Sequence, residues 1–320
     1  MSTRYFLSDF LSAPARRLGL VGLSCILLLS SANLLAKTVQ TKPAGTPAAD
    51  LSATSRQAAL AALPPLMLWV GERPDDVRSW IVGSSRQAKL NSAADNPTPA
   101  IQEQRIGIAV LDTTILLRDG SANVRRRQQA LRLPPAWYAH SGLRQKIPLL
   151  TIVHVDMADD AHKPALNEKQ KRIIVNAVTA AATRSPSQVV QLDFEVMHSQ
   201  KPFLADVVKR SRDALPANVA LSITALASWC VGDAWLTDLP ADEIVPMAFR
   251  MNGDAQRMRE VLDQDGRFPR PECQPSLGLS LDEQPWPGKL RSQRLYLYNG
   301  NAWSATPIAS WSVRLGAFFP

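Results

Sequence analysis

The chain has 320 residues, of which 46% are hydrophobic and 20% are charged. This is an ordinary globular composition, and the length suffices for one large domain or two modest ones. The formal net charge is +8, and the basic excess is dispersed apart from Arg125-Arg126-Arg127. Because no aromatic residues interleave with these arginines, we expect a solvated basic surface and no nucleic-acid partner.

The first 60 residues differ from the rest of the chain. Arg16-Arg17 precede an apolar run over residues 18–29, and small residues follow it. This pattern predicts a secretory signal peptide over residues 1–36, and an uncleaved anchor that tethers the protein to the inner membrane is the alternative. Residues 37–60 are rich in Ala, Thr, Ser and Pro and predict a flexible linker. The protein is therefore expected to be exported, to the periplasm or beyond the cell.

Short apolar runs recur through the remainder of the chain, residues 61–320, which we expect to form a single domain. Several are almost continuously apolar, as is typical of strands covered on both faces. The expected strands cover residues 66–70, 106–111, 148–155, 189–196, 219–226, 244–249, 277–281 and 295–298.

Helical patterns separate some of these runs. Apolar residues recur at helical spacing over 166–183 and again over 204–215, where Pro216 ends the pattern. Asp119-Gly120 predicts a hairpin turn after the second strand. Eight strands alternating with helices predict a (β/α)8 barrel of the TIM type. A doubly wound open sheet is the alternative, although no glycine-rich phosphate loop follows any strand.

The fourth expected strand, VVQLDFEV, carries two carboxylates one residue apart. Strand geometry places Asp193 and Glu195 on one face, about 6.5–7 Å apart along the chain. A neighbouring negative charge raises the pKa of a carboxyl group, which suits the proton donor of a glycosidase. Glu195, nearer the strand end, is the candidate catalytic acid, and Asp193 is its catalytic partner. A structural ion pair, for example with Arg250, is the alternative role.

Other polar and aromatic residues stand at or near strand ends, and in a (β/α)8 barrel these ends meet at the face that carries the active site. The tryptophans among them could stack on a sugar ring or simply pack in the core. The candidate substrate-binding residues are Trp69, Gln191, His154, Asp156, Trp229, Arg250 and Tyr298.

A metal site is a competing use of four of these positions, His154, Asp156, Asp193 and Glu195. No HxH or HExxH spacing occurs, so we expect neither a metal nor another cofactor. Among the cysteines, Cys230 follows the fifth strand and Cys273 precedes the seventh. These positions predict opposite ends of the barrel, and therefore no disulfide between them unless a loop folds back.

The segments LDFEV, LSITALASWC and DEIVPMAFRMNGD, between Gln191 and Asp254, resemble an uncharacterised family of exported bacterial proteins, domain of unknown function 3142. The fourth strand is also distantly similar to the D-x-x-D-x-D-x-E motif of family 18 chitinases, which are (β/α)8 barrels. Asp193 and Glu195 match its last two acids, and Gln191 occupies the preceding acidic position. Met247-Ala248-Phe249-Arg250 is similar to that family's M-x-Y-D, with Arg250 in place of the acid. The resemblance implies that Glu195 is the general acid and that Asp193 assists the acetamido group of the substrate.

Together these features favour a hydrolase that acts on a glycan of the bacterial cell envelope. A carbohydrate- or envelope-binding barrel without catalysis is the main alternative, and a metal-dependent hydrolase is a third. The expected partner is a glycan or another envelope polymer.

Overall fold

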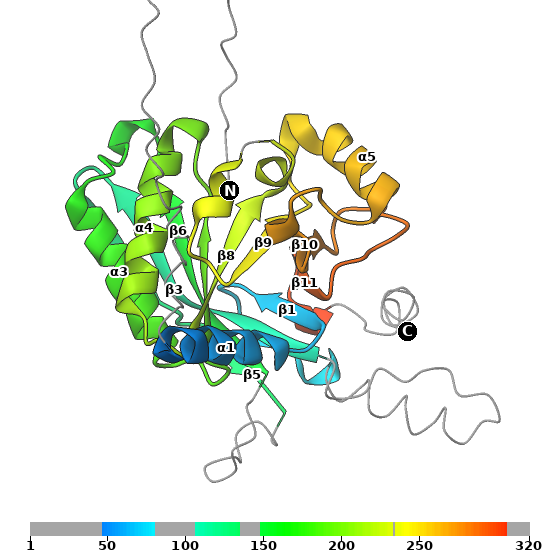
Figure 1. Cartoon of the computed structure of the whole chain (residues 1–320), viewed down its shortest axis with the longest axis horizontal. Helices are drawn as coiled ribbons and strands as arrows, with labels where there is room; N and C mark the ends of the chain where they lie inside the picture. The colour runs from blue at the N-terminus through cyan, green and yellow to red at the C-terminus, as the bar shows by residue number, and fades with distance from the viewer. Residues whose placement is uncertain (1–46, 81–105, 135–147, 233, 306–320) are drawn as a thin grey trace, which may run out of the picture. The chain divides into compact units, whose positions relative to one another are not determined.

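The computed structural model describes residues 47–80, 106–134, 148–232 and 234–305, and the expected signal segment lies outside these ranges. Eight parallel strands close into a barrel, because β1 pairs with both β11 and β3 (Figure 1). The barrel strands are β1 (Leu66–Val70), β3 (Ile106–Arg118), β6 (Leu149–Met157), β7 (Val189–Phe194), β8 (Ala220–Leu226), β9 (Glu243–Met247), β10 (Ser276–Ser280) and β11 (Arg294–Tyr298). The eight strands expected from the sequence are therefore confirmed, and the open-sheet alternative is wrong.

Three crossover helices cover the outside of the barrel within the described ranges: α3 (Glu168–Ala182), α4 (Lys201–Ala214) and α5 (Ala255–Asp265). Local sequence explains their ends. Asn167 and Gln170 form a reciprocal capping box at the start of α3. Gly266 ends α5 with a left-handed φ of 69°, a conformation that glycine adopts without a steric cost.

In the other connections, the described residues form no long helix. β3 turns at Asp119-Gly120 into the antiparallel strand β4 (Ser121–Arg126), which confirms the expected hairpin. Two short strands, β2 (Asp75–Asp76) and β5 (Leu131–Arg132), pair separately. Short 3₁₀ turns, including η5 (Ala227–Cys230) and η6 (Ala234–Asp238), replace a helix after β8. No helix among the described residues has the length and apolarity needed to cross a membrane.

The apolar core has two layers, as the alternation of strand side chains requires. The outer layer lies between the strands and the helices. The inner layer fills the barrel with side chains such as Met67, Leu150, Ile152 and Val245. Gly107 belongs to this inner layer, where a Cβ atom would stand 2.6 Å from the sulfur of Met67, so a larger residue does not fit without a shift.

Helix α1 (Pro47–Ala61) belongs to the same compact unit as the barrel. Its Leu60 is buried with the inner layer, and the backbone carbonyl of Leu60 accepts a hydrogen bond from Arg294 at 2.6 Å. The expectation of a flexible linker is therefore wrong for residues 47–60. Tertiary contacts with the barrel explain the difference, because a single helix of this length is marginal in water.

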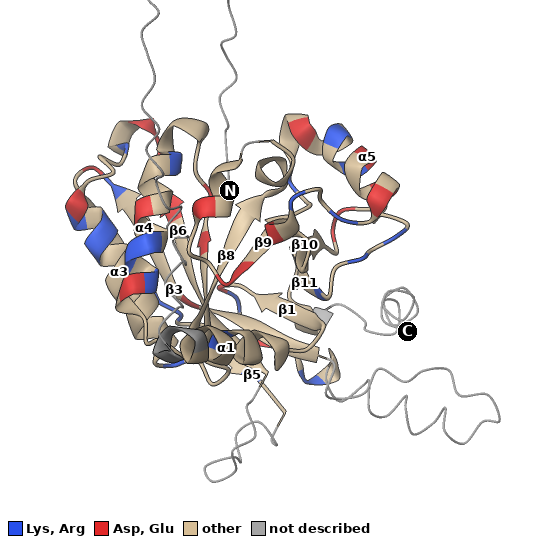
Figure 2. Ribbon diagram, viewed as in Figure 1, with Lys and Arg blue, Asp and Glu red and all other residues tan. Residues whose placement is uncertain are grey.

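Charged residues lie mainly on the helices and loops around the barrel (Figure 2). Glu243 is an exception at the start of β9, since its side chain is 2% exposed inside the barrel. Its carboxylate pairs with Arg294 at 2.5 Å and accepts hydrogen bonds from Ser222, Ser276 and Tyr296 at 2.6–2.8 Å. Burial alone would raise the pKa of Glu243, but Arg294 and these hydroxyl donors hold it below its usual value.

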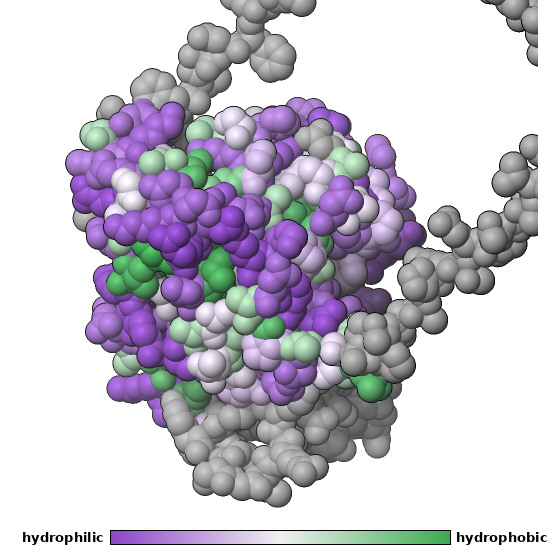
Figure 3. Space-filling view, turned by 60° about the vertical axis from the view of Figure 1, so that its left-hand side comes forward, coloured by the Kyte–Doolittle hydropathy of each residue, from purple (hydrophilic) through white to green (hydrophobic). Residues whose placement is uncertain are grey.

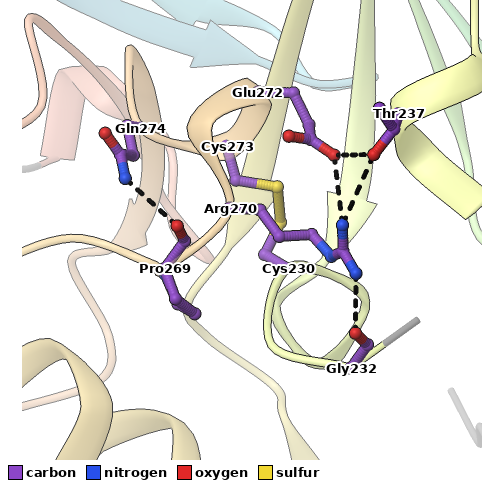
Figure 4. The surroundings of a disulfide bond; sticks show 8 residues. All are labelled: Cys230, Gly232, Thr237, Pro269, Arg270, Glu272, Cys273 and Gln274. Atoms are coloured by element: carbon purple, nitrogen blue, oxygen red, sulfur yellow. Dashed lines mark hydrogen bonds and ion pairs between the residues drawn. A yellow bond between two sulfur atoms is a disulfide. The ribbon is translucent and has the colours of Figure 1, made fainter. Parts of the chain in front are cut away.

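A disulfide joins Cys230 to Cys273, with Cα atoms 6.0 Å apart (Figure 4). The expectation of no bridge is wrong. It assumed that the chain stays at the barrel mouth after β8, whereas η5 folds back against β9 and reaches the turn that precedes β10. Arg270 also connects these two segments, because its guanidinium group donates a hydrogen bond of 2.8 Å to the backbone carbonyl of Gly232.

Candidate functional site

The mouth of the barrel holds a row of charged groups at the carboxyl ends of β6 and β7. Register pairs His154 of β6 with Asp193 of β7, and both side chains lie on the inner face. His154 Nδ1 donates to Asp193 at 2.7 Å, and its Nε2 donates to Asp156 at 3.1 Å. The imidazole therefore bridges two carboxylates.

This arrangement fixes the charge of the histidine. Burial alone would lower the pKa of His154, but the charges and hydrogen bonds of Asp193 and Asp156 raise it to about 11. In return, the hydrogen bond from His154 lowers the pKa of Asp156. At neutral pH the ring is an imidazolium with both nitrogens donating, so it cannot act as a general base in this state.

Asp193 is held at both oxygens. One oxygen accepts from His154, and the other accepts from the hydroxyl of Thr224 on β8 at 2.7 Å. The residue is 6% exposed. Because the carboxylate is held from both sides, its oxygens keep a fixed position beside the adjacent Glu195.

Glu195 is the first residue after β7, so its side chain lies past the end of the sheet. The residue is solvent-exposed, and no hydrogen bond joins its carboxyl group to the described residues. Partial desolvation by the surrounding protein, followed by repulsion from Asp193, nevertheless raises the pKa of Glu195. His154 and Arg250 act in the opposite direction. A carboxyl group that is accessible and unpaired, and whose pKa is raised, has the properties of a proton donor.

Aromatic side chains stand beside these acids. Trp69 of β1 stacks on Tyr298 of β11 with ring centroids 5.0 Å apart, and Phe249 contacts Tyr298 at 4.4 Å. Burial and the nearby Asp193 raise the pKa of Tyr298 well above its usual value, and Glu195 adds to the effect. The phenol therefore stays protonated beside the carboxylates, and its hydroxyl has no hydrogen-bond partner in the described part of the chain.

Arg250 follows β9 and is exposed. Its backbone has a φ of 50°, in the left-handed region, and its N–H donates to Glu283 at 2.8 Å. The sequence gives no sign of this conformation. The side chain is near enough to lower the pKa of Glu195, but it forms no ion pair with Glu195 or Asp193. Arg250 is therefore not the ion-pair partner of these acids, and the ion pair that Asp193 forms is with His154.

Two predicted substrate-binding residues do not belong to this group. Gln191 is fully buried one layer below Asp193 and donates to Ser222 at 3.1 Å, so it cannot touch a ligand at the mouth. Trp229 is 6% exposed and packs edge-on against Trp235 in the outer layer. The prediction for Gln191 is therefore wrong for a ligand at the mouth, whereas Trp229 lines a separate hollow together with Val196 and Met197.

The geometry also does not support the alternative hypothesis that these residues form a metal site. Both nitrogens of His154 are already engaged by carboxylates, and a metal ligand needs a free nitrogen lone pair. Within the described ranges, no three His, Cys, Asp or Glu side chains are grouped as metal ligands would be.

Comparisons with known proteins leave the family open. No family model matches the chain, and no curated protein matches it. A solved structure described as "putative Chitinase A from Streptomyces coelicolor" is similar at 10% identity and a TM-score of 0.41. The match covers 79% of this chain and 97% of that chain. Similarity at this level carries no functional argument, so the fold assignment rests on the closed strand order and the site on its own geometry.

Proposed function

We propose that this protein hydrolyses glycosidic bonds of an envelope glycan, with Glu195 as the proton donor. The observation that carries the proposal is the state of Glu195, which is exposed at the barrel mouth, lacks a hydrogen bond to the described residues and has a raised pKa. Protonation of the leaving oxygen is the step that glycosidases assign to such a carboxyl group.

Asp193 and His154 have supporting roles in this proposal. The fixed carboxylate of Asp193 raises the pKa of Glu195 and stabilises positive charge that develops on the sugar ring in the transition state. The imidazolium of His154 holds Asp193 in its orientation. Thr224 completes this orientation from the other side.

The aromatic group at the mouth supports a sugar as the ligand. Trp69, Phe249 and Tyr298 place flat apolar surface next to the acids, and a pyranose presents a flat apolar face of its own. The protonated hydroxyl of Tyr298 offers a donor for a substrate oxygen. Polar groups that complete an otherwise apolar pocket are the usual source of ligand orientation.

The test compares wild type with Glu195→Gln on fragments of chitin, peptidoglycan and exopolysaccharide. Glutamine preserves the size of the side chain but cannot donate the catalytic proton. We expect new reducing ends with wild type and at least about a hundredfold fewer with the variant, since general acid catalysis contributes about 10²–10⁴-fold. Equal turnover by both proteins would overturn the assignment. Retention of both on a glycan without products would favour the binding barrel.

We further propose that the protein functions outside the cytoplasm. The apolar run after Arg16-Arg17 motivates this proposal, and the Cys230–Cys273 disulfide supports it, because disulfides persist in oxidising compartments. Thiol labelling of protein taken directly from cell fractions tests it. We expect the protein in the envelope or medium with both cysteines blocked, and a reduced cytoplasmic pool would contradict the proposal.

A further inference from the structure

A groove runs along the outer wall of the barrel between α4 and η6, away from the aromatic group at the mouth. Its volume is about 650 Å³. Figure 3 shows one side of the molecule, where small apolar patches interrupt a mainly hydrophilic surface. The residues that line the groove are Lys201, Pro202, Ala205, Asp206, Lys209, Asp213, Trp235, Asp238, Leu239 and Pro240.

A second hollow of about 330 Å³ connects this groove to the end of β7. It begins at Val196 and Met197, directly after Glu195, and continues to Ser228 and Gly232. Lys201 lines both hollows, so they adjoin at this residue. Met197 is 58% exposed although it is a large apolar residue. The second hollow therefore extends the outer groove toward the residues that directly follow Glu195.

The chemistry of the groove favours a neutral ligand. Lys209 pairs with Asp213 at 2.9 Å, and Asp206 pairs with Lys171 at 2.6 Å. The lining holds two lysines and three aspartates, so neither sign dominates and the groove favours neither a polyanion nor a polycation. Hydrogen-bonding groups beside apolar surface remain, and this combination suits the hydroxyls and the flat faces of sugars.

Trp235 is the aromatic side chain in the groove. Its indole N–H is buried and has no hydrogen-bond partner in the described part of the chain. An unpaired buried donor is costly, so a shift of the Trp235 side chain that brings the N–H to a ligand oxygen gains a hydrogen bond at little desolvation cost. The ammonium of Lys201 lies 5.3 Å from the centre of the ring, so a cation and an aromatic ring adjoin in the groove.

We propose that this groove binds a neutral oligosaccharide, as the continuation of the glycan whose bond lies at Glu195. The inference rests on the proposed glycan-hydrolase function for its choice of ligand. The groove supplies affinity for long chains and does not take part in bond cleavage, so its loss weakens the binding of long chains more than that of short ones.

The experiment uses full-length protein carrying Glu195→Gln, so that binding is measured without turnover. Titration calorimetry with chitohexaose and cellohexaose tests neutral chains, chitobiose tests a short one, and a galacturonic acid hexamer tests an anionic one. Trp235→Ala is added to this background, and Arg125→Ala on the distant β4 hairpin is the matched control. Trp235→Phe removes the N–H but keeps most of the ring.

The proposal predicts that a neutral hexasaccharide binds, that Trp235→Ala weakens it about tenfold, and that Arg125→Ala leaves it unchanged. Trp235→Phe should give an intermediate affinity, and chitobiose should be insensitive to all three changes. Should Trp235→Ala fail to fold, Asp238→Ala on the groove rim must weaken the hexasaccharide instead. Tighter binding of the anionic hexamer, or unchanged affinity in the groove variants, would overturn the proposal. Failure of the hydrolase function shows separately, as equal turnover by wild type and Glu195→Gln.

Discussion

Replacing Arg294 by methionine should strongly destabilise the barrel. Methionine keeps an unbranched apolar stem but removes the charge that neutralises Glu243, whose side chain is 2% exposed. Removing one partner of a buried pair costs about 3–5 kcal/mol, because the remaining charge is left unpaired. For a domain of this size that corresponds to a fall in Tm of about 10 °C. The variant also loses the hydrogen bonds from Arg294 to the carbonyls of Leu60 and Pro64, which hold the end of α1.

Urea denaturation followed by circular dichroism measures the loss of stability, and amide exchange over residues 51–61 reports on α1. Arg291→Met is the matched control, because Arg291 is an exposed arginine three residues earlier and its removal should change stability by less than about 0.5 kcal/mol. Adding Glu243→Gln to Arg294→Met should recover at least about 1 kcal/mol, since no unpaired charge then remains. Equal stability of Arg294→Met and Arg291→Met would refute the reasoning.

Three further predictions concern the disulfide and the charged row at the mouth. Replacing Cys230 and Cys273 by serine opens a loop of 43 residues and should lower the free energy of unfolding by about 2–4 kcal/mol while the fold persists. Urea denaturation measures this loss. An unchanged free energy of unfolding would mean that the disulfide adds nothing to stability. The pKa of His154 rises from 6.5 to about 11 on folding, so the contribution of this group to stability is complete below pH 6.5 and is lost as the pH rises through about 11. Nitrogen-15 NMR should show a doubly protonated His154 ring at pH 8. A neutral ring at that pH would contradict the account. Asp193→Asn removes the negative charge that raises the pKa of Glu195, so the alkaline limb of the pH–activity profile should move to lower pH, and a shift to higher pH would contradict the electrostatic role.

The sequence predicted the barrel well because each strand can be recognised from the apolar pattern of its own residues. Runs such as residues 66–70 and 106–111 are apolar on both faces, and burial between helices and the barrel interior requires this. The turn at Asp119-Gly120 was also predictable, because it depends on two adjacent residues. Features that depend on contacts between distant segments were not predictable in the same way. Helix α1 looked like a linker because its stability comes from Leu60 and Arg294, which lie more than 230 residues apart.

The site was predicted in part for similar reasons. Asp193 and Glu195 follow from two acids in an apolar strand, and this pattern is visible in the sequence. The bridging role of His154 requires the register between β6 and β7, and the sequence contains no direct measure of that register. The burial of Gln191 and Trp229 was missed because a residue near a strand end can point into the mouth or into the core.

The central claim is that Glu195 donates a proton to a glycosidic oxygen. The most direct measurement is the release of reducing ends from envelope-glycan fragments by wild type and by Glu195→Gln, with equal folding of both confirmed by circular dichroism. The account predicts products from wild type and at least about a hundredfold fewer from the variant. Equal product from the two proteins, or none from wild type on any fragment it binds, would contradict it.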